Sequence, residues 1–370
     1  MALSKVDLAN QVENQLPQSL VADNVNFRNI IINGDMSIAQ RGTSQASITS
    51  GNYYTVDRWE TELTTLGTWT QSQSTDVPSG QGFSKSLKMD CTVADASPSA
   101  GDSLYVRTLF EGQNLQYLKK GTSNAESLTL SFWVKSTKTG TYIVFFYDQD
   151  NARSISKSYT IDSADTWEKK TITFAGDTTG AFDNDNALSL QVNFFLGGGS
   201  NWTSGTLNTS WNSWTQANAA VGQVNLADNT ANEWYITGVQ LEAGTSASDF
   251  EFLPHDVNLR RCYRYYYKMD STVQYARLAI GFADTTENGN ITIFPEVAMR
   301  IAPSSVDSSN LGLWKTGTIH SVSAVTIDTA TNTKYSTAIN CTSTGLTDGS
   351  VYHLIGNNSA SSILALNSEL

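Results

Sequence analysis

The most regular feature of the chain is an alternation of apolar and polar residues that recurs between residue 29 and about residue 252. Within 127–135 every second residue is apolar, namely Leu128, Leu130, Phe132 and Val134. The stretch 188–196 repeats the pattern with Leu188, Leu190, Val192, Phe194 and Leu196. Because successive side chains of a strand point to opposite faces, this spacing predicts β-strands with one buried face.

Further strands are predicted at 141–147, 167–174 and 233–242, the first as a continuous apolar run typical of a central strand. Turn-forming clusters of Gly, Asn, Asp and Ser separate these stretches. Many short strands joined by polar turns favour an all-β fold, an antiparallel jelly-roll sandwich over residues 27–254. We find no repeat of fixed period, which disfavours a solenoid or a propeller.

A helix is predicted where the strand pattern breaks at Pro254. Asp256 is a good N-cap residue. One face of the helix then carries the apolar and aromatic residues Leu259, Cys262, Tyr263, Tyr266 and Tyr267, while Arg and Lys fill much of the rest. We interpret 255–270 as an amphipathic linker helix that lies against the sandwich. A basic nucleic-acid-binding helix is the weaker alternative in an acidic chain.

The alternating pattern returns after the helix and predicts a second, smaller β-domain over 271–370. Alternate residues from 274 to 282 are mostly apolar, Ile291 and Ile293 continue the pattern, and strands are expected at 318–327 and 334–341. At the other end of the chain, Leu8, Val12 and Leu16 form one apolar stripe of a short helix that ends before Pro17. Residues 1–26 are therefore either a docking segment or a frayed terminus.

Composition excludes several classes of partner. The 370 residues carry a formal net charge of −12, and only 16% of them are charged. A protein that grips nucleic acid through phosphates needs a basic surface, so no nucleic-acid partner is expected. No stretch approaches the ~20 apolar residues of a membrane span, and the N-terminal residues lack the apolar run of a signal peptide. Neutral glycans and other proteins are the expected partners.

The chain lacks the spacings that catalytic and metal sites require. Cys91, Cys262 and Cys341 are far apart, which predicts buried free thiols and fits assembly in a reducing cytoplasm. No phosphate-binding loop, zinc-protease motif or nucleophile elbow occurs, and the three histidines are isolated. We therefore expect no catalytic residue, no cofactor and no enzyme activity. A pair of carboxylates that cleaves a glycan is the less favoured alternative.

Three tryptophans stand out as candidate binding residues. Trp202, Trp211 and Trp214 lie in a stretch rich in Gly, Ser, Thr and Asn. Exposed rings in such a stretch could stack on the C–H faces of a sugar, so the three are glycan-binding candidates. The other interpretation, which we favour slightly, is that they cap one end of the sandwich or lie in a subunit interface. Trp59, Trp133, Trp167 and Trp234 fall in strand patterns and are expected to pack on or within the sheets.

Seven short motifs in order resemble a widespread group of phage tail-fibre and receptor-binding proteins. They are Asn29-Ile-Ile-Ile-Asn-Gly-Asp35, Tyr54-Thr-Val-Asp-Arg-Trp59, Glu111-Gly-Gln113, Leu128-Thr-Leu-Ser-Phe-Trp-Val-Lys135, Thr166-Trp-Glu-Lys-Lys170, Ile236-Thr-Gly-Val-Gln-Leu-Glu242 and Cys262-Tyr-Arg-Tyr-Tyr266. The closing Ser368-Glu369-Leu370 also resembles the end of such a fibre. The resemblance implies a jelly roll similar to carbohydrate-binding modules, a place in the virion and often a homotrimer.

The resemblance also raises the question of a metal. Modules of this shape often hold a structural calcium through a Glu on the first strand and an Asp on the last. The matching positions here are Ser37 and Thr237-Gly238, which supply no carboxylate. Since calcium prefers several hard oxygen ligands, carboxylates above all, we expect no metal site at these positions.

Together these features predict a structural virion protein of a phage, similar to a tail fibre, that assembles in the host cytoplasm. As a homotrimer joined to other virion proteins it would bind host surface polysaccharide, with residues 1–26 serving for virion attachment or oligomerisation. The alternative is a capsid head fibre, a decoration protein or a tail adaptor that binds only other virion proteins. A glycan depolymerase is the third possibility.

Overall fold

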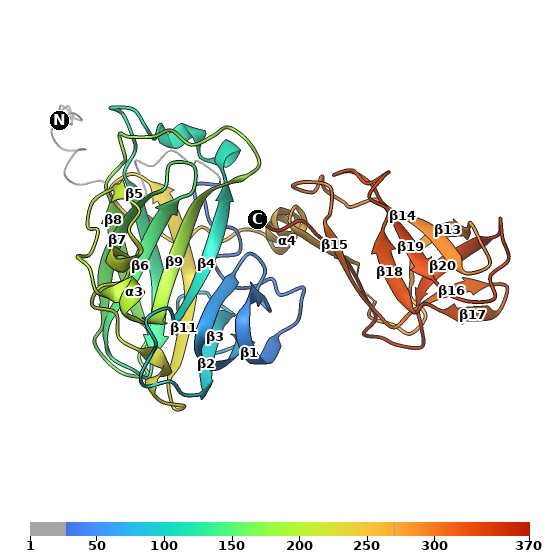
Figure 1. Ribbon diagram of the computed structural model, residues 1–370, viewed down its shortest axis with the longest axis horizontal. Helices are drawn as coiled ribbons and strands as arrows, with labels where there is room; N and C mark the ends of the chain where they lie inside the picture. The colour runs from blue at the N-terminus through green and yellow to red at the C-terminus, as the bar shows by residue number, and fades with distance from the viewer. Residues whose placement is uncertain (1–26, 270) are drawn as a thin grey trace, which may run out of the picture.

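The regular structure of the chain is almost entirely β-strand, as the sequence predicted (Figure 1). A computed structural model describes residues 27–269 and 271–370. The attachment segment predicted at 1–26 lies outside the described residues. No helix within the described ranges has both the length and the apolar composition needed to cross a membrane.

Eleven antiparallel strands form one large sheet that folds over into a sandwich. Their order is β10-β7-β6-β9-β4-β2-β3-β11-β5-β8, and β1 pairs with β2. The bounds are β1 Ser44–Tyr53, β2 Glu60–Ser74, β3 Ser86–Val93, β4 Ser103–Glu111, β5 Leu128–Ser136, β6 Gly140–Asp148, β7 Arg153–Ile161, β8 Glu168–Phe174, β9 Leu188–Gly198, β10 Asn212–Ser213 and β11 Glu233–Ala243.

Strand β2 belongs to both layers of the sandwich. Its residues 60–65 pair with β4, and its residues 68–74 pair with β3. The strand bends between these halves at Thr65 and Gly67, whose φ angles are 49° and 72°. A Cβ at Gly67 would lie 2.5 Å from the Val93 carbonyl oxygen, so a larger residue fits neither the dihedral angle nor the space.

The core between the layers is built by the alternating residues that the sequence singled out. Phe132 of β5 meets Phe194 of β9 with ring centroids 5.2 Å apart, and Phe146 of β6 stacks on Phe174 of β8 at 3.9 Å. Leu128, Leu130 and Val134 lie in the same cluster, together with Leu190, Val192 and Leu196. The predicted inward faces of β5 and β9 are confirmed, except that Leu188 is only partly buried.

The C-terminal strands form a second β-region with its own hydrophobic cluster. A seven-stranded sheet has the order β17-β16-β20-β13-β14-β19-β18, and a three-stranded sheet has the order β12-β21-β15. The bounds are β12 Tyr266–Met269, β13 Arg277–Ala283, β14 Asn288–Ile293, β15 Ser305–Ser309, β16 Leu311–Lys315, β17 Thr318–Ser321, β18 Ala324–Ile327, β19 Thr337–Thr342, β20 Val351–Gly356 and β21 Ile363–Asn367. The single strand predicted at 318–327 is two strands, because β17 pairs with β16 while β18 pairs with β19.

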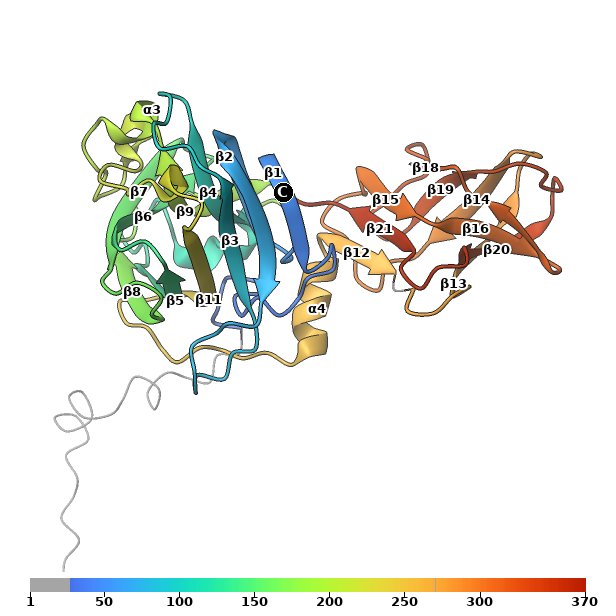
Figure 2. The same cartoon turned by 90° about the horizontal axis from the view of Figure 1, so that it is seen from below.

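Helix α4, His255–Tyr263, lies between the sandwich and the C-terminal strands (Figure 2). The predicted helix 255–270 was too long. Tyr266 and Tyr267 have helical spacing, but they lie in β12 because they pair with Asn367 and Leu366 of β21. The N-cap prediction was also wrong, since Asp256 lies in the first turn and Pro254 takes the cap position.

The end of the chain returns to the sandwich, where it forms a buried ion pair. The Glu369 carboxylate binds the guanidinium groups of Arg58 and Arg41, and the Arg58 side chain is only 1% exposed. Arg300 donates to the Ser368 carbonyl at 2.8 Å and to the Glu369 carbonyl at 2.7 Å. Residues 368–369 therefore fasten the C-terminal strands to the sandwich.

Changing Glu369→Gln should destabilise the protein strongly, because the Arg58 charge would remain buried without a carboxylate. We expect the free energy of unfolding to fall by about 3–5 kcal/mol, measured by urea denaturation. Glu126→Gln is the control, since Glu126 pairs with Lys119 in an exposed bridge that contributes at most about 1 kcal/mol. Equal losses of unfolding free energy in the two variants would contradict the role of Glu369 in fastening the C-terminal strands to the sandwich.

Candidate functional site: the basal cavity

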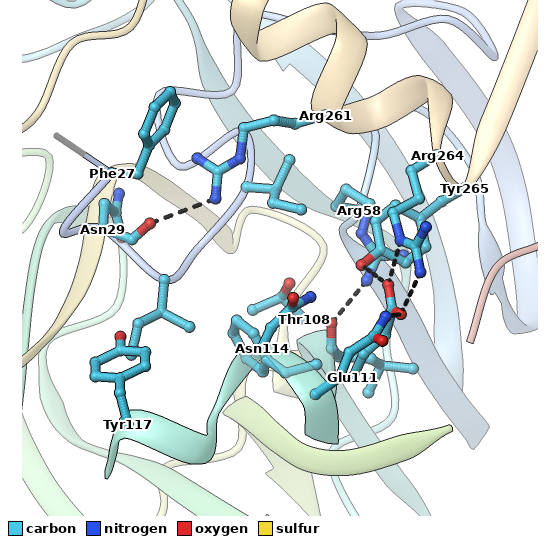
Figure 3. Close-up of a pocket in the computed structure, with 15 residues that line it drawn as sticks. Phe27, Asn29, Arg58, Thr108, Glu111, Asn114, Tyr117, Arg261, Arg264 and Tyr265 are labelled. Carbon is cyan, nitrogen blue, oxygen red and sulfur yellow. Dashed lines mark hydrogen bonds and ion pairs between the residues drawn. The ribbon is translucent and has the colours of Figure 1, made fainter. Parts of the chain in front are cut away.

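A cavity within the described residues, here called the basal cavity, opens beside α4 (Figure 3). Its volume is about 580 Å³, within the roughly 300–1,000 Å³ of typical small-molecule sites. The wall comes from separate parts of the chain: residues 27–32, Arg58, the end of β4, the turns η1 Gly112–Asn114 and η2 Gln116–Leu118, and α4 with Tyr265.

The motif Glu111-Gly-Gln113 turns the chain out of β4 to form one wall. A Cβ at Gly112 would lie 2.0 Å from the Asp183 carbonyl oxygen, so this approach requires glycine. The Gln113 backbone N–H donates to the Asp185 carbonyl at 2.8 Å and fixes the turn. The two short 3₁₀ turns that follow carry Asn114 and Tyr117 at the mouth of the cavity.

The floor of the basal cavity consists of Arg58, Glu111, Arg264 and Tyr265, and the buried carboxylate of Glu111 holds it together. Arg264 donates to both of its oxygens, at 2.7 and 2.6 Å, and the Tyr265 hydroxyl donates at 2.5 Å. Burial opposes ionisation of Glu111, but the hydrogen bonds from Arg264 and Tyr265 outweigh it and lower its pKa. A carboxylate whose two oxygens accept hydrogen bonds and whose pKa is lowered stays ionised, so it is poorly suited to act as a general acid.

Arg58 completes the floor and connects it to Glu369 at the end of the C-terminal strands. Besides its pair with Glu369, it donates to the Leu109 carbonyl at 2.7 Å, and the Tyr265 ring lies 3.5 Å from its guanidinium carbon. Burial would lower the pKa of Arg58, but the Glu369 carboxylate raises it above its usual value. The floor is therefore charged and internally paired, with Arg58, Glu111 and Tyr265 buried and Arg264 half-buried.

The floor brings together residues from motifs that lie far apart in the sequence. Arg58, Glu111, Arg264 and Tyr265 come from three of the seven motifs, and Glu369 comes from the closing tripeptide. Asn29, from the first motif, supports the neighbouring wall by donating to the Val239 carbonyl at 3.1 Å. Four of the seven motifs thus contribute residues that line the basal cavity.

The mouth differs from the floor because its side chains face solvent. Phe27 is 56% exposed and Tyr117 is 51% exposed. Beside them lie the amides of Gln113 and Asn114 and the half-buried guanidinium of Arg261. Rings that offer an apolar face next to amide and guanidinium donors can bind a ligand that is apolar on one side and hydroxylated on its edge.

The structure places the three candidate tryptophans away from the basal cavity. Trp202 and Trp214 pack on the outer face of β6 and β9, with their ring centroids 6.2 Å apart. Trp202 lies 5.3 Å from Phe195, and Trp214 stacks on Phe145 at 5.8 Å. They cover the second apolar face of β6, which accounts for the continuous apolar run predicted there.

Trp211 is separate from this pair. It packs against the main core, and its indole N–H donates to the Ala175 carbonyl at 2.8 Å. The structure therefore brings two of the three candidates together and leaves the third apart. Their role in glycan binding stays a prediction. Trp59 and Trp234 are fully buried, whereas Trp133 and Trp167 are half-buried on a sheet face, which agrees with the packing expected of them.

The positions considered for calcium take part in ordinary hydrogen bonds. The amide nitrogen of Asn258, from α4, donates to the Asp35 carboxylate and to the Ser37 hydroxyl, both at 3.2 Å. The Thr237 hydroxyl donates to the Lys85 carbonyl at 2.7 Å. Cys91, Cys262 and Cys341 are buried free thiols, as predicted.

Sequence reasoning missed the mouth of the basal cavity. Phe27 and Tyr117 lie outside strand patterns, and Arg261 looked like part of the polar face of a helix. One signal was available for Tyr117, since a large ring between Gln116 and Leu118 follows directly on the Glu111 motif. The closeness of these residues depends on pairing between distant segments, which no local pattern encodes.

Comparisons with known proteins give weak structural likenesses. No family model matches the chain, and no curated protein matches its sequence. The enzymatically active domain of bacteriophage CBA120 tailspike protein 4 is 16% identical, covering 58% of this chain and 21% of that one, with a TM-score of 0.31. The C-terminal family 22 carbohydrate-binding module of Clostridium thermocellum Xyn10B is 13% identical, covering 56% and 98%, with a TM-score of 0.28.

A third solved structure is the N-terminal cellulose-binding domain of Cellulomonas fimi β-1,4-glucanase C. It is 14% identical, covering 57% of this chain and 100% of that one, with a TM-score of 0.27. Scores this low carry no argument about what the present chain binds.

If Trp214 packs rather than binds, Trp214→Ala should lower the free energy of unfolding by about 2–4 kcal/mol, because the rings of Phe145 and Tyr147 lose their cover. Tyr335→Ala, at a residue 62% exposed, should change it by less than about 0.5 kcal/mol. Chemical denaturation of both variants makes the comparison. A Trp214→Ala variant of native stability would instead favour the interpretation that Trp214 is a glycan-binding residue.

Proposed function

We propose that this chain is a structural protein of a phage virion, similar to a tail fibre, that binds a glycan of the host surface at the basal cavity and does not cleave it. The observation that carries the proposal is the mouth of the cavity, where two exposed rings lie beside amide and guanidinium donors. Sugars present C–H faces to rings and hydroxyls to amides, so this combination suits them.

The absence of cleavage in this proposal rests on Glu111. It is the carboxylate that lines the basal cavity, and Arg264, Tyr265 and Gln113 all donate to it. Glycoside hydrolysis generally needs two carboxyl groups across the scissile bond, one of which gives up a proton. A single ionised carboxylate in a paired network supports a binding role.

The place in the virion rests on the motifs. Residues from three of the seven motifs, Arg58, Glu111 and the pair Arg264 and Tyr265, meet in the floor of the basal cavity, which supports the resemblance to phage tail-fibre and receptor-binding proteins. A single shallow site binds weakly, and a homotrimer would gain avidity when three copies engage one surface. Other virion proteins are the proposed partners, with residues 1–26 as the proposed segment for virion attachment or oligomerisation.

Tyr117→Ala should weaken glycan binding about 10-fold, because one ring contact contributes about 0.5–1.5 kcal/mol beyond buried area. The measurement is binding of the purified chain to an array of bacterial surface polysaccharides. Tyr335→Ala is the matched control, since it removes an exposed tyrosine from the C-terminal strands. Glycan binding that Tyr117→Ala leaves intact would move the site elsewhere.

Gold-labelled antibodies against the chain should mark the tail of the phage particle in electron micrographs. Label on the capsid faces would instead favour the head-fibre or decoration alternative. Label near the junction of tail and fibres, combined with no glycan binding, would favour the adaptor. The result separates the place of the protein in the virion from its ligand.

A further inference from the structure

The basal cavity is lined by three arginines, of which two are matched by a carboxylate. Arg58 pairs with Glu369, and Arg264 pairs with Glu111. No carboxylate of the described residues lies within 4.0 Å of the Arg261 guanidinium, and its hydrogen bond to the Asn29 carbonyl is long, at 3.5 Å. Arg264 and Arg58 therefore each have a carboxylate partner, which Arg58 shares with Arg41, while Arg261 on the wall formed by α4 has none within 4.0 Å.

Arg261 also lies in surroundings that make its charge costly. Burial lowers its pKa, and the nearby Glu251 offsets this only in part. The Glu251 carboxylate accepts from the backbone N–H groups of Phe27 at 2.7 Å and Asn29 at 2.9 Å, which hold it in place more than 4.0 Å from the Arg261 guanidinium. A partly desolvated guanidinium gains most from an anion that reaches it from the cavity.

We infer that the basal cavity recognises an acidic sugar residue, with the Arg261 guanidinium binding its carboxylate, the Tyr117 ring facing its C–H side and the Asn114 amide binding a hydroxyl. This inference rests on the glycan-binding function proposed above and names the chemical class of the glycan. In Figure 3 Arg261 reaches toward the cavity from α4, while Asn114 and Tyr117 approach from the η1–η2 turn.

The charge of the site favours a carboxylate over a phosphate. A carboxylate carries one negative charge and matches the planar fork of a single guanidinium. A terminal phosphate carries more charge than one unmatched arginine neutralises. The net charge of −12 repels a polyanion at long range, so composition alone pointed to neutral glycans. The selectivity inferred here arises from one local contact within an otherwise acidic protein.

The test uses the full chain and three sets of oligosaccharides on one array. The first contains uronic acids, the second contains the same oligosaccharides after reduction of each carboxyl group to an alcohol, and the third contains phosphorylated neutral oligosaccharides. We expect uronic-acid probes to bind at least about 10-fold more tightly than their reduced forms, because a hydrogen bond to a charged group is lost.

Variants on α4 locate the effect. Arg261→Gln should bind uronic-acid probes about 10- to 100-fold more weakly than the native chain. The affinity of Arg261→Lys should lie between those of the native chain and Arg261→Gln, since lysine keeps the positive charge but lacks the planar guanidinium that binds both carboxylate oxygens. Arg260→Gln is the matched control, because Arg260 is 64% exposed and lies outside the cavity wall. The thermal midpoint of Arg261→Gln should stay at the native value, since Arg261 has no close ion pair to lose.

Each contrary result has a distinct meaning. Equal binding of acidic and reduced probes, or native affinity in Arg261→Gln, overturns the acidic-sugar inference and leaves glycan binding in place. Preference for phosphorylated probes overturns the inference that the ligand group is a carboxylate and indicates that Arg261 binds phosphate. Failure of all three probe sets to bind the native chain overturns the proposed glycan-binding function together with this inference.

Discussion

The architecture depends on one buried charge, the guanidinium of Arg58. A guanidinium that is 1% exposed has lost its water and must find a carboxylate inside the protein. Glu369 supplies it from the far end of the chain, so the C-terminal strands must return to the base of the sandwich. Tyr265 stacks on the same group and fixes the chain just after α4. The Arg58 guanidinium thereby joins the sandwich, the chain after α4 and the end of the C-terminal strands, and contacts such as Gln40 with Tyr266 and Asn186 with Arg300 add to this junction.

The same network gives the basal cavity a rigid floor. Glu111, Arg264 and Tyr265 satisfy one another and hold the end of β4 against the chain that follows α4. At the mouth the rings of Phe27 and Tyr117 are exposed and Arg261 is half-buried, so these side chains can be reached by a ligand. A fixed floor beneath available rings and donors is an arrangement that lowers the entropic cost of binding. Arg261 belongs to the mouth, although the same helix supplies Arg264 to the floor.

Alternation was sufficient to predict β5 and β9 and their inward faces, whereas β2, β3, β4 and β7, which also contribute to the core, were not individually predicted. Leu130 and Phe132 face inward because a period of two places them there, whichever strand they pair with. The apolar run of β6 predicted a central strand, and its outer face is covered by the segment around Trp202 and Trp214. Pairing between distant strands was not predictable in this way. Tyr266 and Tyr267 fit a helical period, yet pairing with β21 makes them a strand. The basal cavity has the same origin, since Phe27, Tyr117 and Arg261 become neighbours only after the sandwich closes and the chain returns.

The most direct measurement is a crystal structure of the full chain with a bound uronic-acid oligosaccharide. The account predicts sugar density in the basal cavity, with the carboxylate at hydrogen-bonding distance from Arg261 and the pyranose ring against Tyr117. Sugar density over Trp202 and Trp214 on the outer face of β6 and β9, with the basal cavity empty, would contradict it.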